Sequence, residues 1–164
     1  MKYVKEYLPY VIVIVVVLLI KSYVITPVFV DGKSMEPNLI NRQILILKRY
    51  DKSLKRFDVV VFKYRNSRLV KRVIGLPGEH IEYKNSKLYV NGELVEEKMI
   101  NKPTSDFKLE KLGYTVIPEG YYFVLGDNRT NSRDSRAIGL ISKKSVMGTV
   151  SLSLFPFNRF GFIK

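Results

Sequence analysis

The feature that most constrains this chain is an unbroken aliphatic run, VIVIVVVLLI, at residues 11–20. Extended to residues 8–25, the run has about 18 residues and is interrupted by Lys21 and Ser22 near its end. This length can cross a bilayer with modest thinning, and a lysine near the end can extend its ammonium to the interface. Tyrosines flank the run on both sides, as interfacial aromatics do. We therefore expect residues 1–25 to form a membrane anchor.

Two alternatives to an uncleaved anchor need weighing. A cleaved secretory peptide needs small residues after its apolar run, whereas this chain continues with the bulky KSYVITPVFVDG. A buried core helix normally has some polar face, and residues 11–20 have none. Lys2 and Lys5 precede the run while Lys21 and Lys33 follow it, so charge favours a cytoplasmic amino terminus only slightly. The expectation is one span in the cell membrane, with residues 26–164 as an extracytoplasmic domain.

Residues 26–164 have the pattern of short strands separated by turns. The candidates are rich in Val, Ile, Tyr and Phe and lie at 27–30, 44–47, 57–64, 68–75, 80–84, 87–90, 121–125 and 146–155. Asn91-Gly92 is a strong signal for a two-residue hairpin, and residues 93–114 look like a polar loop or small excursion. The fold class predicted is mostly β, with coiled antiparallel sheets or a barrel-like domain after one transmembrane helix. The aromatic tail 151–164 is expected to end in a strand packed on the core, rather than to touch the membrane interface.

Composition removes several kinds of chemistry. The chain has no Cys and a single His, His80, which excludes disulfides, thiol catalysis and cysteine-ligated metals. A zinc site would need carboxylates for nearly all its ligands, so we expect no metal and no cofactor. A Ser-His-Asp triad could use only His80, which follows a Pro-Gly turn and is interpreted as ordinary surface.

The formal net charge of +13 raises the question of anionic partners. Residues 1–25 carry +2, which leaves +11 for the remainder. Such a domain could bind anionic lipid or nucleic acid. The charges are dispersed and no nucleic-acid motif accompanies them, so a solvated basic surface near a membrane is favoured, with no nucleic acid bound.

Two segments supply a serine hydroxyl and a lysine amine, which are candidates for a nucleophile and a general base. Ser34 lies in DGKSMEPNL, where Gly32 and Pro37 impose a tight path around it. Lys71 lies in a predicted strand and shares a face with Val73, so an inward-facing amine would be desolvated. Desolvation lowers the pKa of a lysine, and a neutral amine near pH 7 is what a general base requires. Taken singly, each has an ordinary explanation, a turn serine and an edge-strand lysine.

A third segment, GDNRTNSRDSR at residues 126–136, follows a hydrophobic strand. It packs many hydrogen-bonding side chains into one loop, where Asp134 and Arg136 could pair and Ser132 could hydrogen-bond nearby. A solvated polar turn is the alternative, but this density of polar groups directly after a hydrophobic strand favours a structural or functional role.

Together the segments resemble the bacterial type I signal peptidases over nearly the whole chain. The resemblance rests on an anchor, then G-x-S-M-x-P, FDVVVF, KRVIGLPGE and GDNR-x-x-S-x-DSR, in that order. It implies a membrane-bound serine endopeptidase with a Ser-Lys dyad, which removes signal peptides from exported preproteins through an acyl-enzyme. The implied partners are exported preproteins and the phospholipid membrane, and the implied state is a monomer.

The resemblance also implies roles for residues at matching positions. Ser34 matches the nucleophile, Lys71 the general base and Ser132 the hydroxyl that orients the lysine. Oxyanion donors are expected at the backbone of Ser34 and Gly32, although Gly32 stands where some members carry a serine, which leaves the second donor open. Further matching positions comprise supporting and substrate-binding residues: Asp134, Arg136, Asp127, Arg72, Val30, Met35, Leu39 and Val70.

Two rival functions stay open at this stage. Other Ser-Lys enzymes cut themselves or a repressor, although the anchor and the full set of motifs argue against that. A non-enzymatic anchored module that binds anionic lipid or nucleic acid would explain the charge but not the three motifs.

Overall fold

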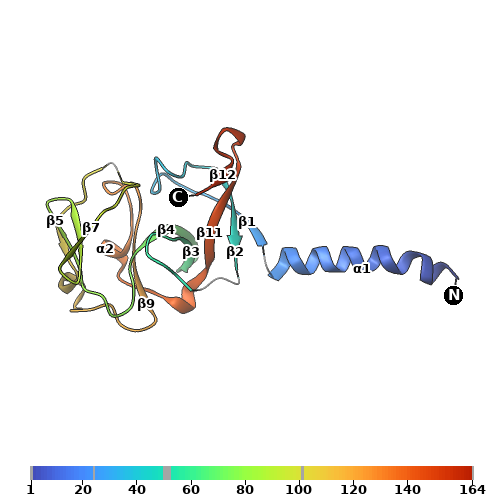
Figure 1. The fold of residues 1–164 in the computed structure, drawn as a ribbon, viewed down its shortest axis with the longest axis horizontal. Helices are drawn as coiled ribbons and strands as arrows, with labels where there is room; N and C mark the ends of the chain where they lie inside the picture. The colour runs from blue at the N-terminus through green and yellow to red at the C-terminus, as the bar shows by residue number, and fades with distance from the viewer. Residues whose placement is uncertain (1, 24, 50–52, 101, 164) are drawn as a thin grey trace.

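The computed structural model describes residues 2–23, 25–49, 53–100 and 102–163 of the chain. Its first element is α1, an α-helix at Lys2–Tyr23, which includes the whole aliphatic run. Figure 1 shows this helix projecting away from a body built mainly of strands. None of the helices in the described ranges is both long enough and apolar enough to cross a membrane.

The body contains a large antiparallel sheet. Its strands are β1 (Ile25–Phe29), β2 (Ile44–Lys48), β3 (Val59–Tyr64), β4 (Ser67–Gly75), β9 (Tyr121–Leu125), β10 (Ile141–Ser142), β11 (Val146–Phe155) and β12 (Gly161–Phe162). They follow the order β1-β2-β11-β3-β4-β9-β10, and β12 pairs with β11. The prediction of mostly antiparallel β structure is confirmed.

The barrel-like closure considered from the sequence is wrong. In the described strands β1 and β10 end the order without pairing with each other, so the sheet is open. The physical reason lies at β10, which has only two residues before the chain turns into the 3-10 helix η2 (Lys143–Ser145). So short a strand offers almost no free edge for a further partner.

A second, smaller sheet lies at the end of the molecule opposite α1 (Figure 1). Its strands are β5 (Ile81–Lys84), β6 (Lys87–Val90), β7 (Glu93–Val95) and β8 (Phe107–Lys108), in the order β7-β6-β5-β8. Asn91 and Gly92 join β6 to β7 with positive φ angles of 52° and 85°, as a two-residue hairpin turn requires. The predicted hairpin is therefore confirmed.

Residues 93–114, predicted as a loop or small excursion, contain more structure than their composition indicated. β7, β8 and the 3-10 helix η1 (Leu109–Leu112) lie within them. Phe107 and Leu109 are buried against the small sheet and hold the segment in place. These apolar residues are too few and too irregularly spaced to give a periodic signal in the sequence.

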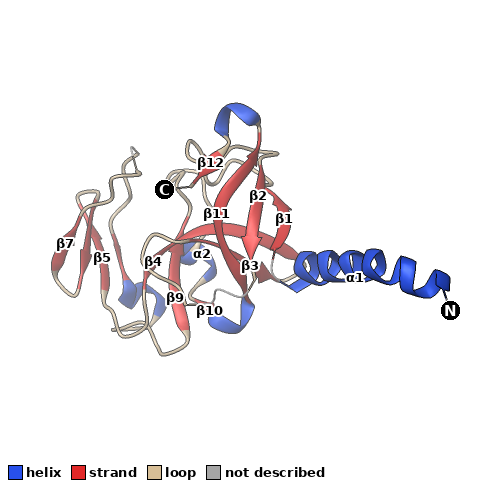
Figure 2. Cartoon of the chain, turned by 45° about the vertical axis from the view of Figure 1, so that its right-hand side comes forward, coloured by secondary structure: helices blue, strands red, loops and turns tan. Residues whose placement is uncertain are grey.

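Strand alternation distributes the core over both faces of the large sheet. Val59 and Val61 of β3 enter one apolar cluster, whereas Val60 and Phe62 enter another. This is the two-residue period of a strand buried on both faces. Figure 2 shows β3 and β4 in the middle of the body, and residues 70–75 of β4 are all buried. Lys71 and Arg72 are consequently held in a dry interior, whereas Ser67 and Arg68 at the start of the strand are exposed.

The carboxyl-terminal tail forms the predicted terminal strand but does not bury its aromatics. β12 pairs with β11 through Leu152↔Phe162 and Ser153↔Gly161. Between them lie the 3-10 helix η3 (Phe157–Arg159) and Phe160. Phe157 and Phe162 are each 82% exposed, so the tail packs on the core through side chains such as Ser153 and Ile163 and not through these aromatics.

Candidate active site

Ser34 lies in the loop between β1 and β2. The loop is closed at its base because Val30 N–H donates to Gln43 O and Arg42 N–H donates to Val30 O. At its tip, Asn128 contacts two consecutive carbonyls. Its backbone N–H donates to Ser34 O at 3.0 Å, and its side-chain Nδ2 donates to Lys33 O at 3.1 Å. The loop after β9 therefore holds Ser34 in place across a separation of more than ninety residues.

Lys71 reaches Ser34 from the middle of β4. Its Nζ lies 2.7 Å from Ser34 Oγ and also donates to Val70 O at 3.0 Å. Lys71 is only 2% exposed. Burial lowers the pKa of the amine from its ordinary value of 10.5 to about 8, against the opposing pull of the Asp134 and Asp127 carboxylates. The dry environment that the sequence required of this lysine is present.

The backbone N–H of Ser34 itself is a free donor. The Ser34 N–H donates to no residue in the described part of the chain. The Gly32 N–H, by contrast, already donates to Asn41 Oδ1 at 2.9 Å. An oxyanion formed beside Ser34 Oγ could accept from the Ser34 amide at once, whereas Gly32 would first have to release Asn41.

Ser132 lies close to this pair but is not hydrogen-bonded to it. Its Oγ is buried and takes no hydrogen-bond partner within the described residues. Ser132 Oγ and the Ser34 carbonyl both lie against Gly126, where an added Cβ would collide with each of them. Gly126 therefore has to be a glycine for Ser132 and Ser34 to come this near. The predicted orienting contact between Ser132 and Lys71 stays a prediction.

Arg72, the residue after Lys71, forms a buried ion pair with Asp127. Arg72 Nε lies 2.9 Å from Asp127 Oδ1 and Nη2 lies 2.7 Å from Oδ2, and both side chains are almost inaccessible. Asp127 Oδ2 also accepts from Asn38 Nδ2 at 2.8 Å, which ties the far end of the Ser34 loop to the same carboxylate. The pair thus connects β4, the Ser34 loop and the segment after β9.

Asp134 and Arg136 form the ion pair predicted for them. Arg136 Nε lies 2.9 Å from Asp134 Oδ1 and Nη2 lies 2.8 Å from Oδ2. Asp134 also caps the short helix α2 (Ser135–Ile138) and accepts from Gly126 N–H at 3.1 Å. It therefore fixes the backbone of the glycine on which Ser132 and Ser34 rest.

Sequence reasoning missed the role of Arg129. Its guanidinium is buried and pairs with Glu97 at 2.5 Å, and it also donates to Thr104 Oγ1, Tyr83 Oη and Gly126 O. These contacts join the small sheet to the loop that holds Ser34. The signal available was the arginine within GDNR, but its partners Glu97 and Thr104 lie in the polar segment 93–114, which has no periodicity.

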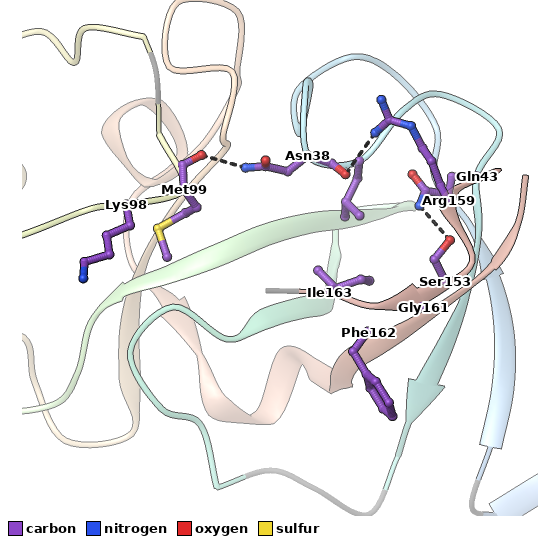
Figure 3. A pocket seen from close by; sticks show the side chains of 10 residues that line it. Asn38, Gln43, Lys98, Met99, Ser153, Arg159, Gly161, Phe162 and Ile163 are labelled. Atoms are coloured by element: carbon purple, nitrogen blue, oxygen red, sulfur yellow. Dashed lines mark hydrogen bonds between the residues drawn. The ribbon is translucent and has the colours of Figure 1, made fainter.

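The four predicted substrate-binding side chains meet beside Ser34. Val30, Met35, Leu39 and Val70 belong to one apolar cluster, and each is between 1% and 9% exposed. In this structure the four side chains are packed in the core next to the site, and together they do not form an open pocket. Leu39 also borders an adjoining pocket of about 630 Å³ that neither Ser34 nor Lys71 lines. Figure 3 shows Asn38 on one side of that pocket, hydrogen-bonded to Met99, and Arg159 donating toward the same loop.

His80 lies apart from these groups. Its Nε2 is 3.0 Å from Glu110 Oε1, and both side chains are partly exposed beside the small sheet. Among the described contacts it makes none with Ser34, so the hydroxyl's basic neighbour is Lys71.

Comparison with known proteins assigns this arrangement to a family. A family model described as signal peptidase, peptidase S26 matches residues 3–155. Signal peptidase I S of Bacillus subtilis (strain 168) is 40% identical over 159 residues, which cover 90% of this chain and 86% of the relative. Signal peptidase IB of Staphylococcus aureus (strain Mu50 / ATCC 700699) is 38% identical over 178 residues, covering 95% and 93%.

A solved structure is similar as well. The crystal structure of a signal peptidase I from Enterococcus faecalis V583 matches with a TM-score of 0.56 and 43% identity, over 59% of this chain and 96% of that one. The chain belongs to the signal peptidase family, peptidase S26. It is accordingly a serine peptidase by family. The resemblance to signal peptidases that the ordered motifs indicated is confirmed.

Proposed function

We propose that this protein removes signal peptides from exported preproteins, with Ser34 as nucleophile and Lys71 as general base. The observation that carries the proposal is the 2.7 Å separation between Lys71 Nζ and Ser34 Oγ, in which the lysine is buried and the serine partly exposed. A serine hydroxyl is a weak nucleophile until a base within hydrogen-bond reach removes its proton. Lys71 has that reach, and its lowered pKa supports the neutral form that the role demands.

The first step is proton transfer within this pair. When the Lys71 amine is neutral, Ser34 Oγ–H donates to the Nζ lone pair. Ser34 Oγ then attacks the scissile carbonyl, Lys71 takes the proton and delivers it to the leaving amine, and a Ser34 acyl-enzyme remains. Lys71 next takes a proton from a water molecule, whose oxygen attacks the ester carbonyl. Lys71 then returns the proton to Ser34 Oγ as the C–O bond to Ser34 breaks, which releases the carboxylic acid product and restores the hydroxyl.

Backbone geometry supports binding of the oxyanion and of an extended substrate. The free Ser34 N–H points to one oxyanion donor, and a donor of this kind contributes about 3–4 kcal/mol to transition-state stabilisation. β1 is an edge strand of the large sheet and leads directly into the Ser34 loop. An extended peptide can add to such an edge through main-chain hydrogen bonds. The apolar cluster behind Ser34 favours small side chains at the −1 and −3 positions of the substrate.

Ser132 is proposed as the residue that orients Lys71. Its buried Oγ lacks a partner among the described residues, and a buried hydroxyl left unpaired costs free energy. A hydrogen bond with the Lys71 amine would supply one. The proposed role is to hold the amine in line with Ser34 Oγ during proton transfer.

The proposal includes a place at the membrane. Residues 1–25 are proposed as a single anchor with a cytoplasmic amino terminus, and residues 26–164 as an extracytoplasmic catalytic domain that acts as a monomer. Leu8 and the aliphatic residues 11–17 are each about half exposed, so the surrounding protein does not cover them. Apolar surface of this extent needs a cover other than water. An anchor would bring Ser34 to the surface where a signal peptide emerges.

Processing of a preprotein in vesicles tests the function. Wild-type protein should release the mature product, and the Ser34→Ala and Lys71→Ala variants should leave the preprotein intact. His80→Ala is the matched control and should cleave like wild type, because His80 pairs with Glu110 outside the site. Normal cleavage by either dyad variant would overturn the mechanism. Self-cleavage with preproteins untouched would overturn the substrate assignment.

A further inference from the structure

A second hollow of the molecule, away from Ser34, is lined by cationic side chains. It has a volume of about 600 Å³ and is bordered by Arg49, Lys63, Arg65 and Lys144, together with residues 145–147. Arg49 follows β2, Lys63 belongs to β3, Arg65 lies in the β3–β4 turn and Lys144 lies in η2. Three separate parts of the chain thus bring four positive charges around one concave surface, called here the basic hollow.

The charges of the basic hollow have no acidic partner among the residues that the structure describes. No carboxylate in the described part of the chain pairs with any of the four, and no acidic residue lines the hollow there. Elsewhere arginines find acidic partners, as Arg56 does with Glu79. Arg65 instead lies over the ring of Tyr64, 5.5 Å from its centroid. Like charges held together repel, so this surface is poised to accept an anion.

The basic hollow lies at the end of the sheet where α1 enters. The first residue of β1, Ile25, pairs with Lys48 of β2, and Arg49 is the next residue. Figure 2 shows the end of β2 beside the junction of α1 and β1. A ligand that contacts Arg49 would therefore lie near the carboxyl end of α1, where the helix meets β1. This position separates the hollow from the small sheet, which lies at the opposite end of the molecule.

We propose that the basic hollow binds the phosphate of an anionic phospholipid headgroup. The inference rests on the proposed membrane placement of residues 1–25, because that placement brings the hollow to the headgroup layer. A lysine or arginine near an anionic membrane contributes enough to change affinity about fivefold. Four such groups, with no counter-charge among the described residues, distinguish anionic from zwitterionic lipid, since only the former carries net charge. The site orients the domain on its anchor and is separate from the Ser34–Lys71 chemistry.

The test uses the full chain in a neutral detergent. The protein is titrated with phosphatidylglycerol or, separately, with phosphatidylcholine. Native mass spectrometry then counts the lipids bound to each protein molecule. Wild type should bind phosphatidylglycerol preferentially. The double variant Lys63→Gln/Lys144→Gln should weaken that binding about 25-fold, at fivefold per charge. The matched control is Lys84→Gln/Lys87→Gln, which removes two exposed facing lysines of the small sheet. It should bind the lipid like wild type.

Two outcomes would overturn the inference. Equal loss in the control variant would mean that the overall charge attracts the lipid and that no site exists. If millimolar inorganic phosphate binds as tightly as phosphatidylglycerol and displaces it, the hollow is a site for free phosphate and not for a lipid. Cleavage of a soluble signal-sequence peptide is measured on the same samples. Absence of cleavage by wild type would count against the proposed function alone, because lipid binding is scored independently of it.

Discussion

Lys71 and Arg72 are neighbours on one strand and both are almost wholly buried, but their surroundings differ in charge. Arg72 faces Asp127 in a two-pronged ion pair. Lys71 has no carboxylate within hydrogen-bond reach in the described structure and contacts a hydroxyl and a backbone carbonyl instead. Strand alternation points them to opposite faces of β4, so each finds a different environment within one residue step.

The difference shows that burial of a charged side chain can have two consequences. On one face of β4 it stabilises the structure through an ion pair, and on the other it changes the pKa of an amine. A buried charge with a matched counter-charge stays ionised and links the elements around it. A buried amine with only neutral contacts loses part of its preference for the proton, which is why the pKa of Lys71 falls to about 8. The same strand therefore supplies a permanent cation and a candidate base.

Exchange of the cation type should produce the largest effect. Lys71→Arg keeps a positive charge but cannot deprotonate, so kcat/KM for a signal-sequence peptide should fall at least about 10³-fold. Arg72→Lys keeps a cation opposite Asp127 and should stay within about tenfold of wild type per folded molecule. Steady-state kinetics on both purified variants measures this. Equal losses would show that the two faces of β4 do not differ in role.

Removal of the counter-charge should produce the next largest effect. Asp127→Asn leaves the Arg72 guanidinium buried without its carboxylate, which should lower the free energy of unfolding by about 3–5 kcal/mol. Urea denaturation followed by circular dichroism provides the measurement. The double variant Arg72→Met/Asp127→Leu should be less destabilised than the single one, because no charge is then left unpaired. A double variant that is worse than the single variant would contradict this account.

Removal of the unpaired cation should have the opposite sign. The pKa of Lys71 is lower in the folded than in the unfolded chain, so the charged lysine is a cost below pH 8, and stability recovers as pH rises from about 8 to 10.5. Lys71→Met should therefore be inactive yet more stable than wild type at pH 7, by on the order of 1–3 kcal/mol. The gain should shrink toward pH 10.5. A variant less stable than wild type at pH 7 would contradict the assigned cost.

The smallest effect concerns the pH dependence of kcat/KM, namely the pH at which its acidic limb rises. The neutral form of Lys71 is required, so kcat/KM should rise with pH through an apparent pKa of about 8. The Asp134 carboxylate raises that pKa, and Asp134→Asn should move the limb to lower pH. Profiles normalised to their own maxima separate this shift from loss of folded protein. Glu79→Gln, which alters an ion pair with Arg56 outside the site, should leave the limb in place.

The elements with regular patterns were predictable from the sequence. Strands 87–90, 121–125 and 146–155 have the predicted bounds, because alternation or runs of β-branched and aromatic residues mark them locally. The Asn91-Gly92 turn was predictable because its backbone needs two positive φ angles. β8 and β10 were not, since strands of two residues depend on the partner that bonds them and carry no period of their own.

The candidate site divides in the same way. The sequence by itself determined the types of reacting group available: one histidine, no cysteine, and an ordered set of motifs around Ser34, Lys71 and residues 126–136. Only the tertiary structure decided that Lys71 Nζ lies 2.7 Å from Ser34 Oγ while Arg72 receives the carboxylate. It also decided that Arg129, through Tyr83 and Glu97, joins the small sheet to the loop after β9 that holds Ser34. Distances between residues far apart in the chain, and the loss of water around them, arise only when the strands pack, so no local pattern encodes them.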